Sequence, residues 1–142
     1  EMTATVDAVD TAAGTITVLG QSIQVNNLTI MKDDEDANGQ TPVRHFSLKN
    51  ISPGDRVDIH AYAATSGGTL VATKLERVNA SSPAIAQLDG KISQMGAGQL
   101  TISGITVDTS GVSTTSVSVG NQIQVSGNFS GGVLVATSLN KS

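Results

Sequence analysis

Apolar and polar side chains alternate along most of this chain. A period of two places every second side chain on the same face of a β-strand, so that one face is buried and the other meets water. The side chains predicted to point inward in the first half are Ile16 and Val18, Ile23 and Val25, Val57, Ile59 and Ala61, and Leu70, Ala72 and Leu75. Glycines at positions 14, 20 and 67–68 mark the turns between them. The pattern predicts hairpins, and no helix beyond one short turn within residues 46–51.

One segment of the chain occurs twice. The sequence GGTLVATKLE at residues 67–76 returns as GGVLVATSLN at residues 131–140. Further matches lie upstream in the same order, residues 14–20 with 98–104 and residues 52–59 with 118–125. The repeat therefore covers a whole module, and two copies are too few for a solenoid.

The repeat divides the chain into two domains. Residues 1–79 form the first, which carries an acidic insertion at residues 31–45, and residues 84–142 form the second. Residues 79–83, Asn-Ala-Ser-Ser-Pro, are the predicted linker. About five short strands per copy is the size of a small closed barrel, which removes the open edges of a sheet. We therefore expect an all-β protein of two tandem small antiparallel β-barrels.

Three motifs resemble a known family. They are Gly-x-Ile-Thr-Val at residues 14–18, Pro-Gly-Asp-x-Val-x-Ile at 53–59 and Gly-Gly-x-Leu-Val-Ala-Thr-x-Leu-Glu at 67–76. Together they resemble the bacterial domain-of-unknown-function family numbered 5666. The resemblance implies tandem OB-like barrels, a place in exported proteins and lipoproteins, and no enzyme activity. The second copy departs from the pattern at Gly120-Asn121, where the first has Gly-Asp.

Composition narrows the classes of partner. The chain has a net charge of −4, 2% aromatic residues and no cysteine. Nucleic acid is not an expected partner, because binding it needs clustered basic residues and aromatic faces for stacking. No apolar run is long enough to cross a bilayer, and Glu1 opens without a signal-peptide pattern, which we interpret as a trimmed mature region. The Ser/Thr/Gly-rich composition is typical of exported bacterial β-proteins. We therefore expect a periplasmic or extracellular location, with a lipid anchor as one option for the full-length protein.

The acidic insertion contains the spacing of a calcium loop. Positions 1, 3, 5 and 6 of that loop are Asp34, Asp36, Asn38 and Gly39. Alternate carboxylates would converge on Ca²⁺, and the Gln40 carbonyl would be the next ligand. However, His45 stands where a bidentate glutamate belongs, and no helices flank the loop. A weak calcium site and a solvated acidic loop both remain open, and the second copy, with Asp-Thr-Ser-Gly at residues 108–111, cannot form the same site.

The outward face of the strand at residues 56–62 is the second candidate. It carries Arg56, Asp58, His60 and Tyr62, whereas the matching positions of the second copy are Gln122, Gln124, Ser126 and Asn128. This charged stripe is a candidate surface for a protein or glycan partner in the cell envelope. The alternative is an ordinary solvated strand face.

Catalytic motifs are scarce. No nucleophile elbow, P-loop or dinucleotide motif is present, and a metal site on His45 and His60 would need acids brought in by the fold. Hydrolysis by paired acids such as Asp55 and Asp58 is a third and weaker hypothesis. We expect a non-enzymatic binding or scaffold module without a bound cofactor. The alternative is a calcium-dependent ligand- or carbohydrate-binding module that uses the acidic loop at residues 33–40.

Overall fold

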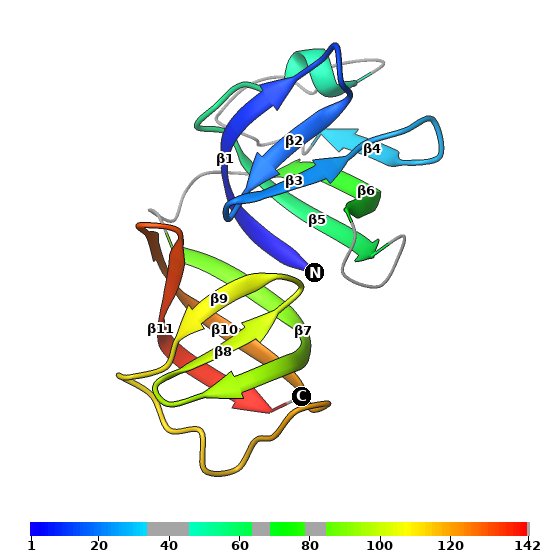
Figure 1. Ribbon diagram of the computed structural model, residues 1–142. Helices are drawn as coiled ribbons and strands as arrows, with labels where there is room; N and C mark the ends of the chain where they lie inside the picture. The colour runs from blue at the N-terminus through cyan, green and yellow to red at the C-terminus, as the bar shows by residue number, and fades with distance from the viewer. Residues whose placement is uncertain (34–45, 64–68, 79–84, 142) are drawn as a thin grey trace.

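The computed structural model describes residues 1–33, 46–63, 69–78 and 85–141, and its strands form two barrels (Figure 1). The strands of the first barrel are β1 (Met2–Asp10), β2 (Thr15–Val18), β3 (Gln21–Gln24), β4 (Ile30–Asp33), β5 (Arg56–Ala63) and β6 (Leu70–Val78). The strands of the second barrel are β7 (Ile85–Gly96), β8 (Gln99–Ile102), β9 (Ile105–Asp108), β10 (Gln122–Ser130) and β11 (Val133–Lys141). The predicted pair of tandem β-barrels is confirmed.

Each barrel closes through a ring of five strands. The order is β1-β2-β3-β6-β5 in the first and β7-β8-β9-β11-β10 in the second, and the last strand of each ring pairs with the first. Five strands cannot alternate in direction all the way round a ring, so one neighbouring pair must be parallel. That pair is β3–β6 in the first barrel and β9–β11 in the second, while the other ring pairs are antiparallel. This is the five-stranded arrangement expected of an OB-like barrel.

The core consists of the side chains that alternation places inside. Of the ten predicted in the first copy, eight are buried, and Val25 and Ala61 are partly buried against the core. Ile16, Ile23 and Ile59 are completely inaccessible to solvent. The period-two pattern therefore assigned the inner face of the barrel wall correctly.

The two copies match even in their irregularities. A β-bulge interrupts the β5–β6 register between His60 and Ala61, and another interrupts β10–β11 between Ser126 and Gly127. The first strands are also irregular at equivalent places, after Val6 in β1 and after Ile92 in β7. Because bulges bend a strand sharply, their repetition gives both walls the same curvature.

The two-residue turns after β2 and β8 have the same backbone conformation. Leu19 and Gly20 have φ angles of 52° and 73°, and Ser103 and Gly104 have 51° and 78°. Positive φ at both central residues is the conformation that fits the twist of a two-residue hairpin. Leucine is unfavourable there, yet Leu19 is only 3% exposed. Packing between the barrels therefore outweighs the local backbone preference at this position.

The barrels are joined by a short ladder between β1 and β7. Met2 pairs with Leu88 and Thr3 with Gln87, and the amide of Asp89 donates to the Glu1 carbonyl over 2.7 Å. Met2 lies four residues before the β1 irregularity, as Leu88 lies four residues before the one in β7. Equivalent residues thus pair with each other, and the ladder has a local pseudo-twofold axis.

The beginning of the acidic insertion belongs to the first barrel wall. Strand β4 runs parallel to β6, with Met31 opposite Leu75 and Asp33 opposite Arg77. Both carboxylate oxygens of Asp33 accept hydrogen bonds from Arg77, over 2.8 and 2.7 Å. The predicted short turn is confirmed as a 3-10 turn, η2 (Leu48–Asn50), and Phe46 before it stacks on the Arg77 guanidinium at 5.1 Å.

Candidate binding groove between the barrels

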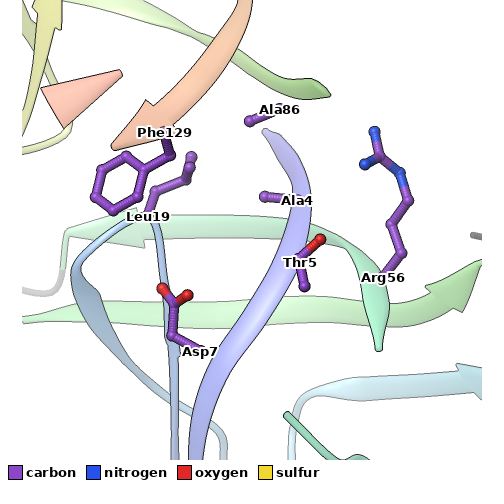
Figure 2. A pocket seen from close by; sticks show the side chains of 7 residues that line it. All are labelled: Ala4, Thr5, Asp7, Leu19, Arg56, Ala86 and Phe129. Carbon is purple, nitrogen blue, oxygen red and sulfur yellow. The ribbon is translucent and has the colours of Figure 1, made fainter. Parts of the chain in front are cut away.

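Two hollows lie where the barrels meet, and each is lined by residues of both copies. The smaller, of about 270 Å³, is called the filled groove and is bordered by Ala4, Leu19, Arg56 and Phe129 (Figure 2). The larger, of about 550 Å³, is called the open groove and is bordered by Gln21, Tyr62, Ser93, Gln94, Ser103 and Gly104. The pseudo-twofold axis relates Asp7, Leu19 and Phe129 at the filled groove to Ser93, Ser103 and Ala63 at the open groove.

Large side chains occupy the filled groove. Phe129, near the end of β10, and Leu19, in the turn after β2, lie next to each other in Figure 2. A methyl group built on Gly20 would lie 3.2 Å from the tip of the Phe129 ring, so the ring packs closely over this turn. The first barrel's turn and the second barrel's last hairpin are thereby held together by apolar contact.

Small or polar side chains replace these two in the open groove. Phe129 stands two residues after Gly127, where the β10 bulge lies, and the position two residues after Ala61 in β5 is Ala63. The residue equivalent to Leu19 is Ser103, which has the same φ. The open groove is about twice as large as the filled groove. We attribute the difference to Ala63, which stands in place of Phe129, and to Ser103, which stands in place of Leu19.

Uncharged polar groups line the open groove. From the first barrel, the amide of Gln21 crosses to the second and donates to the Gly104 carbonyl over 2.9 Å. Ser93, Gln94 and Thr101 contribute from β7 and β8. Such amides and hydroxyls can donate and accept hydrogen bonds without carrying charge.

One aromatic ring lies at this groove. Tyr62 is the single tyrosine of the chain, and 53% of it is exposed. An exposed tyrosine offers both an apolar ring face and a hydroxyl, and this combination is frequent in binding surfaces. The groove thus combines one stacking face with several hydrogen-bonding groups.

The predicted stripe on β5 runs along the contact between the barrels. Tyr62 lines the open groove, and His60 and Asp58 follow beside the start of β1. Arg56 corrects the expectation of an open charged face, because it is 8% exposed and its Nη2 donates to the Ile85 carbonyl over 2.6 Å. The second barrel covers this side chain, so it is not available to an external partner.

The middle of the stripe is a cluster of three titratable groups. His60 Nε2 lies 3.1 Å from Oε2 of Glu1 and 3.9 Å from Oδ2 of Asp58. Burial raises the pKa of the Glu1 carboxyl above its ordinary value, and the hydrogen bond and negative charge of Asp58 raise it further. The His60 charge acts in the opposite direction.

The proposed calcium ligands Asp34, Asp36, Asn38 and Gln40 lie outside the described residues, as does His45. At the border of that loop, Asp33 is engaged by Arg77, and the hydrogen bonds to Asp33 raise the pKa of the guanidinium. Both Asp33 oxygens are committed to the barrel wall.

Asp55 and Asp58, the paired acids of the hydrolase hypothesis, contact different groups. Asp55 accepts a hydrogen bond from the amide of Ser52 and lies 3.7 Å from Arg77, whereas Asp58 belongs to the cluster with Glu1 and His60.

Sequence reasoning missed most of the groove. Gln21, Ser93, Gln94 and Ser103 belong to no motif, and their convergence depends on how the barrels pack. A signal was nevertheless present in the repeat, because Leu19 aligns with Ser103 and Phe129 with Ala63. Such exchanges of large for small residues between copies indicate an asymmetric packing.

Comparison with known families confirms the resemblance. The model of the family described as Domain of unknown function (DUF5666) matches residues 3–76 and 89–139, one segment in each barrel. The chain therefore belongs to this family. No curated protein and no solved structure matches it. Among the described residues, no helix is long and apolar enough to cross a membrane.

Proposed function

We propose that this protein is a non-enzymatic binding module of an exported bacterial envelope protein, and that its open groove binds an uncharged, hydroxyl-rich ligand of the carbohydrate class. The observation that carries the proposal is the asymmetry between the two grooves. Ala63 and Ser103 leave open in one groove the space that Phe129 and Leu19 fill in the other. The walls of that space present hydrogen-bonding groups from Gln21, Ser93 and Gln94 beside the apolar side chains of Ala61, Ala63 and Leu70.

The groove chemistry favours a neutral glycan over a charged ligand. Sugar hydroxyls both donate and accept hydrogen bonds, as the side-chain amides of Gln21 and Gln94 do. The Ser93 hydroxyl donates to the Thr101 carbonyl and can still accept a hydrogen bond. The face of a sugar ring is apolar enough to lie on an aromatic ring such as Tyr62. None of the described residues that line this groove is charged, so an ionic ligand would find no counter-charge among them.

An envelope role rests on the composition and on the family resemblance. A hydroxyl-rich, cysteine-free, acidic chain is typical of exported β-proteins, and glycans are abundant ligands outside the cytoplasm.

The test is a titration of the protein with short neutral oligosaccharides of hexoses and N-acetylhexosamines, followed by isothermal calorimetry. We expect saturable binding of at least one of them, and a loss of roughly tenfold or more in affinity for Tyr62→Ala, which removes the stacking face. Ser103→Leu, which introduces the side chain of Leu19 at the equivalent turn, should abolish binding by filling the groove.

A control variant separates filling from general damage. Val119→Ser changes an exposed residue that does not line either groove, and it should leave the affinity unchanged. If no oligosaccharide binds, or if Ser103→Leu binds as well as the parent, the open groove is not a glycan site. Capture of an envelope protein by the parent but not by Ser103→Leu would instead identify the groove as a protein-binding surface and would contradict the glycan proposal.

A further inference from the structure

The cluster on β5 contains the residue types of a metal site. Glu1 precedes β1, and Asp58 and His60 lie two positions apart on the outer face of β5. One ligand atom from each of the three lies within 4.8 Å of the others. A metal site on His60 requires further ligands. Asp58 lies on the same strand. The pairing of β1 with β5 brings Glu1 beside them, since Met2 lies opposite Ile59 and Thr3 opposite Asp58.

The separations fit a single small ion. Ligand atoms of a tetrahedral zinc site lie 2.0–2.2 Å from the metal and therefore roughly 3.4 Å from one another. The distances from His60 Nε2 to the Glu1 and Asp58 oxygens, 3.1 and 3.9 Å, lie on either side of that value. Side-chain rotations of the exposed Glu1 and the half-buried Asp58 would adjust these separations to one ion.

A neighbouring hydroxyl orients one ligand. Thr3 Oγ1 donates to Oδ1 of Asp58 over 3.2 Å, and the other oxygen, Oδ2, is the one that faces His60. Metal-binding carboxylates commonly have such a hydrogen bond, which fixes the direction of the free oxygen. On the neighbouring strand, the Thr73 hydroxyl donates to the His60 carbonyl over 3.1 Å and holds the strand that carries the imidazole.

The carboxylates of Glu1 and Asp58 lie close together, and their negative charges favour binding of a cation. A divalent ion satisfies both charges, and the neutral imidazole of His60 offers a lone pair as third ligand. One nitrogen and two oxygen ligands suit zinc, copper or nickel better than calcium, which prefers oxygen ligands alone.

We propose that Glu1, Asp58 and His60 bind a divalent transition-metal ion at the contact between the barrels, with Thr3 as the residue that positions Asp58. The positions that match Asp58 and His60 in the second copy are Gln124 and Ser126, so the site belongs to the first copy alone. It lies on the strand that also carries Tyr62. The ion would cross-link β1 to β5 next to the β1–β7 ladder.

Zinc alone is the probe, titrated by calorimetry into metal-free protein without an N-terminal tag, with the melting temperature followed in parallel. We expect one zinc per chain and a raised melting temperature, because an ion that binds only the folded state stabilises it. His60→Ala and Asp58→Asn should abolish both effects. Thr3→Val should weaken zinc binding by roughly tenfold, the lower end of the effect of removing a hydrogen bond to a metal ligand.

Ser126→Ala is the matched control, since it alters the equivalent position in the second copy and should bind zinc as the parent does. All variants are compared by circular dichroism without metal to confirm that they fold. Zinc binding that is absent in the parent, or unchanged in His60→Ala, overturns the proposal. Because the titration contains no sugar, its outcome is independent of glycan binding in the open groove.

Discussion

Ala63 occupies in the first barrel the position that Phe129 occupies in the second, two residues beyond the same β-bulge. The two residues face opposite grooves of a pseudo-twofold arrangement, and the difference between them leaves one groove open. The repeat thus supplies two similar walls, and substitutions on those walls make the two grooves different. A binding site can arise in this way without any insertion or catalytic motif.

The first prediction concerns the filled groove. Phe129→Ala should reduce the free energy of unfolding by roughly 1–2 kcal/mol, less than the truncation of a fully buried phenylalanine, because the ring is only partly buried. Urea unfolding of the parent and the variant measures this difference. A change below about 0.3 kcal/mol would show that the ring contributes no packing between the barrels.

The second prediction concerns Gly127 in the β10 bulge. A methyl group at this position would lie 2.8 Å from the carbonyl carbon of Val135 and 2.9 Å from the Cα of Ala136, both of them backbone atoms that cannot move aside cheaply. Gly127→Ala should therefore cost about 1–3 kcal/mol, the range for overpacking. Gly96→Ala is the control, because its nearest contact is 3.7 Å, to the flexible side chain of Gln99. Equal unfolding midpoints for the two variants would contradict the bulge geometry.

The third prediction concerns Arg77. Its side chain is 7% exposed, binds both oxygens of Asp33, and donates to the Asn50 carbonyl over 3.2 Å. Arg77→Ala withdraws the guanidinium from a buried carboxylate and should cost about 3–5 kcal/mol.

Lys74→Ala on the same strand is the control for Arg77→Ala. Its ion pair with Glu76 is 4.0 Å long and its side chain is 39% exposed, so the change should be below about 1 kcal/mol. Chemical denaturation of both variants at one salt concentration makes the comparison. A loss for Arg77→Ala no larger than that for Lys74→Ala would show that the buried pair does not hold β4 to β6.

The fourth prediction concerns pH. The folded-state pKa of Glu1 is raised, so folding favours its protonated form; this contribution is fully present below the unfolded pKa and is lost as pH rises through the folded value. The melting temperature of the parent relative to Glu1→Gln should therefore fall as pH rises through that window in metal-free buffer.

The stability contribution of Asp108 should change with pH in the direction opposite to that of Glu1. Hydrogen bonds from Ser110 lower the pKa of its carboxyl, so its contribution is present above the unfolded pKa and is lost as pH falls through the folded value. Asp108→Asn should accordingly lose more relative stability at neutral than at acidic pH. Parallel trends for Glu1→Gln and Asp108→Asn would contradict the assignment of the two shifts.

The barrel walls were predictable from the sequence because their physics is local. Alternation identifies the inner face, and the repeated GG-x-LVAT segment identifies the last hairpin of each barrel, so that buried residues such as Ile59 and Leu75 were assigned correctly. The alternating pattern does not reveal strand direction. Once five strands form a ring, however, one pair must be parallel, as β3–β6 and β9–β11 are.

The contact between barrels was not predictable in the same way. The pairing of Met2 with Leu88 joins residues far apart in the chain, and no periodicity encodes it. Alternation placed Arg56 on the outer face but could not reveal that the second barrel covers that end of β5. The sequence did not indicate that Glu1 lies beside His60. Their proximity depends on the register of β1 against β5, which no local pattern reveals.

The most direct test of the open groove is an amide-resolved NMR titration of the labelled protein with the oligosaccharide that binds best. We expect the largest chemical-shift changes at Gln21, Tyr62, Ser93 and Ser103, and no change at residues of the filled groove such as Leu19. Saturable shifts confined to residues outside the open groove, or no shifts for any oligosaccharide of the panel, would contradict this expectation.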